Sequence, residues 1–273
     1  MVSWIAAGCR WMRDDTRGDS VRYVAIGDSF TEGVGDELPD GSVRGWADLV
    51  ARGWADGTGR TIEYANLAIR GKLIWPIVDE QLERALALRP THVSFNGGGN
   101  DMLRPRIPLS RVVDAFSRVL QRCDEEGVTL ILLSGANPSA QLPLSRLIQS
   151  RGDALSRQVV ARVEGRNDVV RALNWPDREL STPGYWAQDR LHMNARGHHR
   201  VAARVLHALG VEAPGEWWSL PALELPRLGA GRYTRDHLGP WVRRRLTGTS
   251  SGDGRAAKHP SFITIVPAAT AEP

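Results

Sequence analysis

Between residues 20 and 210, short apolar runs rich in β-branched residues alternate with longer segments in which apolar residues recur every three to four positions. The short runs are typical of buried strands, and the longer segments have the period of amphipathic helices. Strands that alternate with helices form a parallel sheet with helices on its faces. The sequence therefore predicts an α/β fold. The expected strands are Val21–Ile26, Thr61–Ala65, His92–Asn96, Val128–Ser134 and Asp168–Leu173.

Three segments carry the apolar stripe of a helix: residues 74–86, 110–123 and 195–209. The second is the clearest, because Ser110 can cap its start and Gly127 follows its last apolar position. Each helix follows a predicted strand or a loop next to one. This arrangement places the loops at the carboxyl ends of the strands, where open α/β sheets bind their ligands.

The texture of the chain changes after Gly210, where prolines and tryptophans interrupt the periodicity. We expect an N-terminal extension at residues 1–20, one main domain at residues 21–210 and a Pro-, Trp- and Arg-rich appendage at residues 211–273. The last 20 or so residues are expected to be poorly ordered. The tryptophans of the appendage are expected to pack back on the domain, and the alternative is that they form a wall of the substrate site.

The composition is that of a globular protein, with 42% hydrophobic and 24% charged residues in a chain of 273. The formal net charge is +4, which could indicate an anionic partner. However, the stretch from Arg227 to Lys258 holds eight basic and two acidic side chains, so the rest of the chain is slightly negative. The basicity belongs to the appendage, and no nucleic-acid partner is expected for the domain.

No apolar run approaches the roughly 18 residues of a membrane-spanning helix, so stable membrane insertion is not expected. The first residues lack the basic start of a signal peptide, and the apolar stretch before Cys9 is short for a lipoprotein leader. We expect a cytoplasmic protein. Phosphate-loop, dinucleotide and metal-binding motifs are absent from the sequence, and neither a cofactor nor a metal is expected.

Ser29 is the first candidate for chemistry, because the strand 21–26 runs directly into Gly27-Asp28-Ser29. A serine at this turn is well placed to attack a carbonyl carbon, provided that a base takes its proton and donors stabilise the oxyanion. Taken alone, the segment is more typical of a capped turn between a strand and a helix than of a catalytic site.

The second candidate is a pair, Asp189 and His192, immediately before the last predicted helix of the domain. An aspartate three residues before a histidine can accept a hydrogen bond from one ring nitrogen, which leaves the other nitrogen free to act as a base. His198 and His199 compete for this role, but no carboxylate precedes them at that spacing, and we interpret them as helix-face residues.

Two further segments could supply oxyanion donors. Gly97-Gly98-Gly99 lets the backbone approach a ligand closely, and the following Asn100 carries a side-chain amide. After the second strand, the segment from Asn66 ends at Gly71, whose N–H could be another donor. Each segment alone is equally consistent with a tight turn.

In order and spacing, these four blocks resemble the signature of the SGNH (GDSL-type) hydrolase superfamily. The blocks are Gly-Asp-Ser, Asn-x-Ala-x-x-Gly, Gly-Gly-Asn-Asp and Asp-x-x-His, and the resemblance spans residues 21 to about 210. Longer strings around them resemble SGNH proteins common in actinobacteria. The resemblance implies a three-layer α/β/α sandwich with a five-stranded parallel sheet.

The resemblance also implies the role of each site residue. Ser29 would be the nucleophile, His192 the general base and Asp189 the residue that orients it. The oxyanion hole would combine the N–H groups of Ser29 and Gly71 with the side-chain amide of Asn100. On this basis we expect a serine esterase that acts on a small-molecule, lipid or sugar ester, without a cofactor. The chain length of the acyl group and the oligomeric state stay open.

Two alternatives are weighed against this hypothesis. A carbohydrate acetylesterase or an acyltransferase would use the same triad on a different substrate. A binding protein would instead use the basic appendage to hold a nucleic acid or an anionic membrane. A second serine motif at residues 248–252, Gly-Thr-Ser-Ser-Gly, has the spacing of a nucleophile elbow, but no apolar strand precedes it, and we interpret it as flexible tail.

Overall fold

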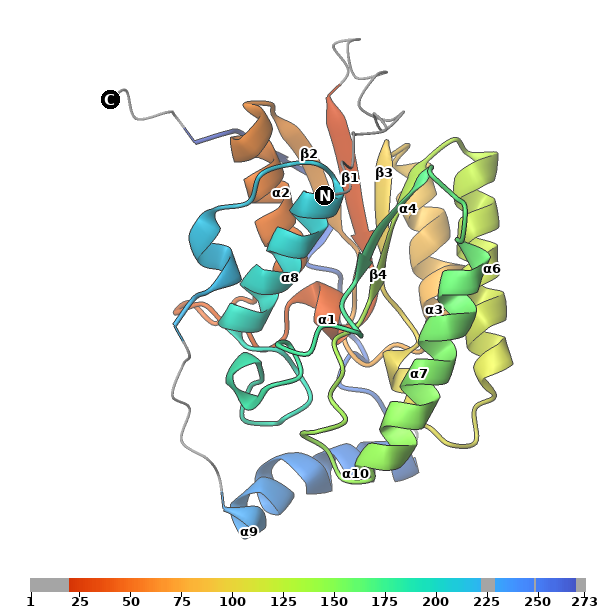
Figure 1. Cartoon of the computed structure of the whole chain (residues 1–273), viewed down its shortest axis with the longest axis vertical. Coiled ribbons are helices and arrows are strands. Elements are labelled where there is room, and N and C mark those ends of the chain that lie inside the picture. Colours follow the sequence, from red (N-terminus) through yellow and green to blue (C-terminus); the bar gives the residue numbers. More distant parts are fainter. Residues whose placement is uncertain (1–19, 222–228, 248, 269–273) are drawn as a thin grey trace, which may run out of the picture.

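The computed structural model describes residues 20–221, 229–247 and 249–268 of the chain. Its centre is a six-stranded sheet in the order β5-β4-β3-β1-β2-β6, and β1 to β4 are labelled in Figure 1. The first five strands are parallel, and β6 pairs with β2 in the antiparallel direction. The strands are β1 (Val21–Ile26), β2 (Ile62–Asn66), β3 (His92–Phe95), β4 (Thr129–Ser134), β5 (Val169–Leu173) and β6 (His259–Ile265).

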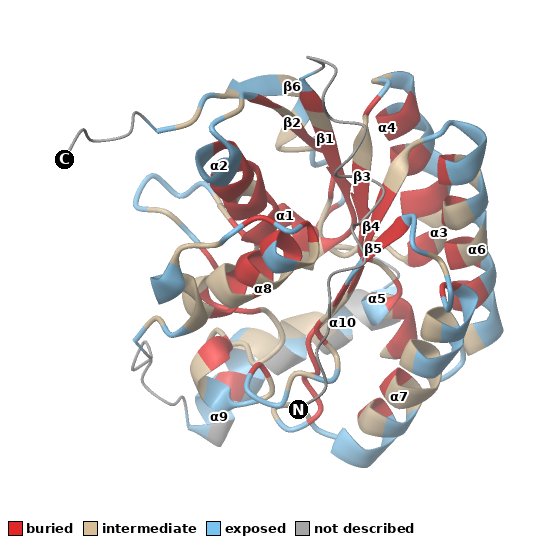
Figure 2. Cartoon of the chain, turned by 45° about the horizontal axis from the view of Figure 1, so that its top comes forward, coloured by how far each residue is buried: buried red, intermediate tan, exposed pale blue. Residues whose placement is uncertain are grey.

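Helices cover both faces of the sheet and complete three layers (Figure 2). Alternate side chains of β1 point to opposite faces: Tyr23 and Ala25 join the core beneath α2 and α8, whereas Val24 and Ile26 join the core beneath α3, α4 and α6. The helices around the sheet are α1 (Ser29–Glu32), α2 (Trp46–Thr58), α3 (Ile74–Pro76), the π-helical η2 (Ile77–Leu82), α4 (Glu83–Ala87), α5 (Gly99–Met102), α6 (Leu109–Glu125), α7 (Ser145–Arg162) and α8 (Ala195–Ala208).

The predicted α/β class is confirmed, and each predicted strand forms within a residue or so of its expected ends. The three predicted helical segments correspond to α3 to α4, α6 and α8. Two long helices, α2 and α7, lie outside the predicted segments. In α7 only Ile148 and Gly152 are buried, so this helix lacks the continuous apolar stripe by which sequence periodicity finds a helix.

The count of five strands is corrected by β6, which comes from the segment expected to be poorly ordered. The backbone of β6 pairs with β2 from Ile62 opposite Ile265 to Asn66 opposite His259. Ile265 packs against one core, and Phe262 packs against the other. Residues 259–265 are therefore an edge strand of the domain, because both the pairing edge of β2 and the two cores offer them contacts.

The residues after α8 return to the domain before they reach β6. Trp217 lies in a short 3₁₀-helix, η4 (Gly215–Trp218), and packs against the core beneath α2 and α8. Farther on, α9 (Ala230–Tyr233), the π-helical η5 (Thr234–Leu238) and α10 (Gly239–Thr247) run across the end of the molecule where α7 begins (Figure 1). Of the predicted N-terminal extension, only Ser20 is among the described residues.

Candidate active site

Ser29 stands at the first position of α1, directly after the carboxyl end of β1. The side chain of Asp28 caps this helix by accepting a hydrogen bond from the Phe30 N–H at 3.1 Å. Position 27, before Asp28, has no room for a residue larger than glycine. A Cβ on Gly27 would lie 2.4 Å from Thr31 Oγ1 and 2.7 Å from a backbone oxygen. The crowded turn therefore fixes the direction in which Ser29 leaves the sheet.

His192 connects Ser29 to Asp189. Its Nε2 lies 3.0 Å from Ser29 Oγ, and its Nδ1 lies 2.5 Å from Asp189 Oδ2. The other oxygen, Asp189 Oδ1, accepts the backbone N–H groups of Leu191 and His192, each at 3.0 Å. The carboxylate is thus held by three donors on its own loop, and it orients the imidazole so that Nε2 faces the serine hydroxyl.

The same contacts set the charges of the pair. Burial alone would raise the pKa of Asp189, but the hydrogen bond and the charge of His192 outweigh it and lower that pKa to about 2. Burial opposes a positive charge on His192, yet the hydrogen bond and the charge of Asp189 raise the pKa of the imidazole above its ordinary value. The pair therefore favours an imidazolium beside a carboxylate, the charge distribution that proton transfer from Ser29 would create.

The loop that carries the pair is fixed at both ends. Asn194 caps α8 by accepting the Gly197 N–H at 3.1 Å, and its amide donates to the carbonyl oxygen of Gly184 at 3.0 Å. Trp186 and Met193 form an isolated antiparallel bridge across the loop. These contacts hold His192 on a closed turn just before a helix, in agreement with the position expected from the sequence.

His198 and His199 have other partners, so the structure confirms them as helix-face residues. His198 is fully buried; its Nδ1 accepts the Trp46 N–H at 3.1 Å, and its Nε2 lies 3.2 Å from the carbonyl oxygen of Val34. Burial lowers the pKa of His198 to about 4. Nδ1 of His199 lies 2.7 Å from the carbonyl oxygen of Ala195. His198 is therefore a neutral structural bridge between α8 and the loop after α1.

Asn100 reaches the site from α5, and its amide nitrogen already has two acceptors. Nδ2 donates to Asp28 Oδ2 and to the carbonyl oxygen of Lys72, each at 3.1 Å. Sequence reasoning missed Asp28 as a partner, although its position beside Ser29 in the Gly-Asp-Ser block was a signal. Burial raises the pKa of Asp28 to about 6. The bonds from Asn100 connect the loop after the third strand to the turn that carries Ser29 and to the loop after Gly71.

Gly71 adopts a left-handed conformation, with φ at 76°, beside a turn that the sequence pattern predicts to be flexible tail. A Cβ on Gly71 would lie 2.2 Å from Ser250 Oγ. Gly252 is equally confined, because a Cβ there would lie 2.1 Å from the carbonyl oxygen of Arg70. The interpretation of residues 249–252 as flexible tail is therefore wrong: they form a close contact with the loop that holds Gly71.

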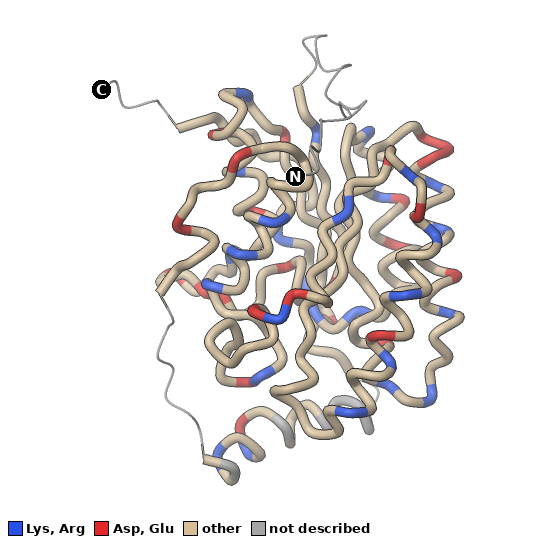
Figure 3. Tube along the Cα trace, in the orientation of Figure 1, with Lys and Arg blue, Asp and Glu red and all other residues tan. Residues whose placement is uncertain are grey.

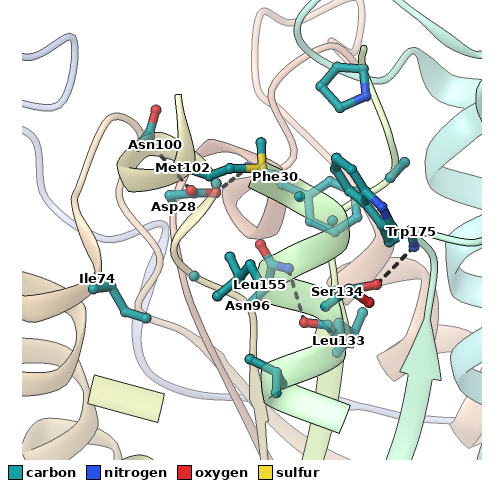
Figure 4. Close-up of a pocket in the computed structure, with 18 of the residues that line it drawn as sticks. Asp28, Phe30, Ile74, Asn96, Asn100, Met102, Leu133, Ser134, Leu155 and Trp175 are labelled. Atoms are coloured by element: carbon teal, nitrogen blue, oxygen red, sulfur yellow. Dashed lines mark hydrogen bonds between the residues drawn. The ribbon is translucent and has the colours of Figure 1, made fainter. Parts of the chain in front are cut away.

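A cavity of about 160 Å³ opens beside Ser29, and Ser29, Asn100 and His192 all line it. We call it the inner chamber. It extends along the sheet beneath α6 and α7, where its walls are mainly apolar and include Leu155 and Trp175, both labelled in Figure 4. Trp175 is fixed there by hydrogen bonds to Ser134 and Asp153, each at 2.8 Å.

Neither a metal site nor a membrane-spanning helix occurs among the described residues. Within residues 20–221, 229–247 and 249–268, no three His, Cys, Asp or Glu side chains are grouped as a metal site requires. In the same part of the chain, none of the helices combines the length and the apolar character that crossing a bilayer requires.

Comparison with known proteins decides the family. Residues 25–200, more than half of the chain, match the model of the GDSL-like lipase/acylhydrolase family. The chain belongs to this family. The hydrolase is accordingly an ester-hydrolysing enzyme, and the resemblance to SGNH hydrolases seen in the sequence is confirmed. Among curated proteins, none matches its sequence.

Solved structures share the fold of the hydrolase. A catalytic mutant of Axe2, an acetylxylan esterase from Geobacillus stearothermophilus, has a TM-score of 0.60 at 20% identity, over 71% of this chain and 96% of that one. The lipase Lip_vut3 from a goat rumen metagenome has a TM-score of 0.59 at 19% identity, over 71% and 99% of the chains. TesA has a TM-score of 0.56 at 23% identity, over 69% and 97%.

Proposed function

We propose that the hydrolase cleaves carboxylic esters through an acyl-enzyme on Ser29. His192 Nε2 takes the proton of the Ser29 hydroxyl as its oxygen bonds to the ester carbonyl carbon. His192 then gives that proton to the departing alcohol, and water, deprotonated by the same nitrogen, releases the acid. The observation that carries the proposal is the hydrogen-bonded chain from Ser29 Oγ through His192 to Asp189, with steps of 3.0 and 2.5 Å.

The oxyanion of the tetrahedral intermediate would be held by the N–H groups of Ser29 and Gly71 and by the amide of Asn100. Asn100 Nδ2 would then exchange one of its present acceptors, Asp28 or the Lys72 carbonyl oxygen, for the substrate oxygen. Gly71 contributes a backbone donor without a side chain in the way. Donors that are already directed to the place where charge develops give the largest single contribution in reactions of this type.

The inner chamber favours an acyl group that is larger than acetyl. Its walls beyond Ser29 and Asn100 are mostly hydrocarbon. The affinity for an acyl group therefore rises with each methylene that the chamber removes from water. An acetyl group would leave most of this surface without contacts. The chamber therefore supports a short- or medium-chain aliphatic acyl ester over the carbohydrate acetylesterase alternative. A substrate panel that also contains acetylated sugars distinguishes this activity from that of a carbohydrate acetylesterase. Adding an acceptor alcohol to the assay distinguishes hydrolysis from acyl transfer.

The ion pairs of the appendage disfavour the alternative of a binding protein. Arg232 and Arg235 both pair with Asp236, and Lys258 pairs with Asp48. Basic and acidic residues are interspersed along the Cα trace (Figure 3). A nucleic acid needs a continuous basic surface, and these pairs neutralise part of the one that the sequence suggested.

The decisive experiment is Ser29→Ala, measured with p-nitrophenyl butyrate. We expect turnover to fall by on the order of 10⁴-fold or more, with the folded structure retained, because the nucleophile and its base act as a unit. Ser42→Ala and His199→Ala are the matched controls, since both residues lie outside the hydrogen-bonded chain, and each should keep near-native turnover. A trapped acyl group on Ser29, found by mass spectrometry, would support the intermediate. Undiminished turnover in a folded Ser29→Ala variant would overturn the proposal.

A further inference from the structure

A second cavity, of about 430 Å³, lies next to the inner chamber, and the appendage forms part of its wall. We call it the outer groove. One side comes from α5, the loop before α7 and α7 itself, and the other side comes from α9, η5 and α10. The residues that line it on the appendage side are Tyr233, Asp236, His237, Pro240 and Trp241.

The inner chamber and the outer groove meet at the catalytic histidine. His192 and Leu191 line both spaces, as does Met102. Ser29 and Asn100 line the inner chamber and are not among the residues of the outer groove. The nucleophile therefore faces one space, while the base faces both.

This division matches the two halves of an ester. The acyl carbon bonds to Ser29 Oγ, so the acyl group belongs in the space that Ser29 lines. The alcohol oxygen receives its proton from His192 Nε2, so the alcohol belongs on the side of the imidazole that continues into the outer groove. We propose that the outer groove binds the alcohol portion of the substrate, and that the appendage determines which alcohols the enzyme accepts. This inference rests on the proposed acyl-enzyme mechanism.

The lining of the outer groove specifies an apolar or aromatic alcohol. Leucines, prolines and Trp241 make up most of its wall. Leu144 and Leu147 are 71% and 42% exposed, and they belong to the small set of large apolar side chains that the described structure leaves in water. A bulky alcohol would cover both, at a gain of roughly 25 cal/mol for each Å² of apolar surface removed from water.

The appendage wall is anchored to the loop that carries Asp189 and His192, so it can determine which alcohols fit beside His192. Tyr233 is buried, and its hydroxyl donates to the carbonyl oxygen of Asp189 at 3.3 Å. The guanidinium of Arg190 lies 4.3 Å from the centre of the Tyr233 ring. On the opposite wall, Arg151 is held by the carbonyl oxygens of Met102 and Ile107, each at 2.8 Å. Both walls are thus fixed relative to His192.

The test compares two esters that share a butyrate acyl group and differ in the alcohol: ethyl butyrate and 2-(2-naphthyl)ethyl butyrate. Both alcohols are primary, so their leaving tendencies are similar. In Trp241→Ala we expect kcat/KM for the naphthylethyl ester to fall about tenfold, a typical value for an aromatic contact, while the ethyl ester changes less than about twofold. The control is Trp218→Ala, because Trp218 contacts Arg200 and His207 and does not line the groove. This variant should leave kcat/KM for both esters unchanged.

A second variant keeps the test decisive if Trp241→Ala fails to fold. Leu147→Trp adds volume inside the groove from a surface position of α7, and it should lower kcat/KM for the naphthylethyl ester about tenfold while sparing the ethyl ester. The proposal is overturned if neither folded variant changes the ratio between the two esters, or if both esters fall together. If the wild-type enzyme hydrolysed neither ester, or if the Ser29→Ala variant still hydrolysed them, the acyl-enzyme mechanism itself would be contradicted.

Discussion

Residues 21–210 and the C-terminal segment at residues 229–268 contribute to the enzyme in different ways. The first region carries the proposed nucleophile Ser29, the proposed base His192 and the carboxylate of Asp189, all on segments outside its strands. The second region contributes no residue to that chain of hydrogen bonds. It nevertheless touches the machinery at three places: the Asp189 loop, the loop that holds Gly71 and the end of α1. Some of the contacts that fix the positions of the proposed site residues thus come from a part of the sequence that supplies none of those residues.

Of these three contacts, the one made by Lys258 involves the most hydrogen-bond acceptors. Its ammonium nitrogen lies within hydrogen-bond distance of the carbonyl oxygens of Glu32, Val43 and Arg44 and of the carboxylate of Asp48, at 2.6 to 3.0 Å, so its three protons are shared among four acceptors. One side chain therefore joins the end of α1, the following loop and the first turn of α2. Since α1 begins at Ser29 and ends at Glu32, the contact anchors the far end of the helix that carries Ser29.

The largest expected effect lies in the first region. In Asp189→Asn, kcat should fall by on the order of 10³- to 10⁴-fold, because the neutral amide no longer stabilises the imidazolium of His192 or fixes its tautomer. Single-turnover kinetics with p-nitrophenyl butyrate would measure the loss. An equal loss in Asp177→Asn, whose carboxylate pairs with Arg200 and Arg204, would mean that general damage to the fold explains the result.

The next effect tests the second region through stability. We expect Lys258→Met to lower the free energy of unfolding by about 3 kcal/mol, because it leaves the largely buried carboxylate of Asp48 without its partner. Burial already raises the pKa of Asp48 to about 6, against the opposing charge of Lys258. Without Lys258 that pKa rises further, so the destabilisation should be greater at pH 8 than at pH 5, where Asp48 takes up a proton.

The control for this measurement is the other lysine of the chain, Lys72, whose pair with Glu80 lies at the surface. Lys72→Met should cost less than about 0.5 kcal/mol. Urea denaturation at the two pH values measures both variants. Equal losses from the two lysines would show that Lys258 does not brace the domain.

The pH dependence of the reaction distinguishes the two regions more finely. His192 must be neutral to accept the serine proton, and Asp189 raises the pKa of the imidazole, so kcat/KM should rise with pH along a limb whose midpoint lies above the ordinary histidine value of about 6.5. Asp189→Asn should move the midpoint to lower pH. Tyr233→Phe, which alters only the backbone contact of the C-terminal segment, should leave it unchanged. A shift in Tyr233→Phe would mean that the second region tunes the base directly.

The smallest expected effect concerns the turn at residues 249–252. In Ser250→Ala the hydroxyl that donates to the Arg70 carbonyl oxygen and accepts the Gly252 N–H is lost. We expect kcat to fall about three- to tenfold with little change in KM, because a hydrogen bond of this kind contributes about 1 kcal/mol and its loss loosens the Gly71 donor. A change confined to KM would place the role of Ser250 in substrate binding.

The sequence predicts the first region well, because its signals are local. A buried strand followed by Gly-Asp-Ser, or an aspartate three residues before a histidine, can be recognised within a few positions. The contacts of Asn100 with Asp28 and Lys72 span 72 and 28 positions, and no local pattern announces them. The same is true of β6: one short apolar run after Pro260 becomes a strand only because β2 offers an unpaired edge to it.

The link between Lys258 and Asp48 spans 210 positions, and this separation has a consequence for biosynthesis. At a translation rate of roughly 10 residues per second, Asp48 emerges about 20 s before its partner is made. During that interval the nascent sheet exposes the backbone of β2, the kind of open edge that pairs with other chains. The arrival of residues 258–265 covers it, so premature termination upstream of Lys258 should yield aggregation-prone polypeptide rather than a smaller working enzyme.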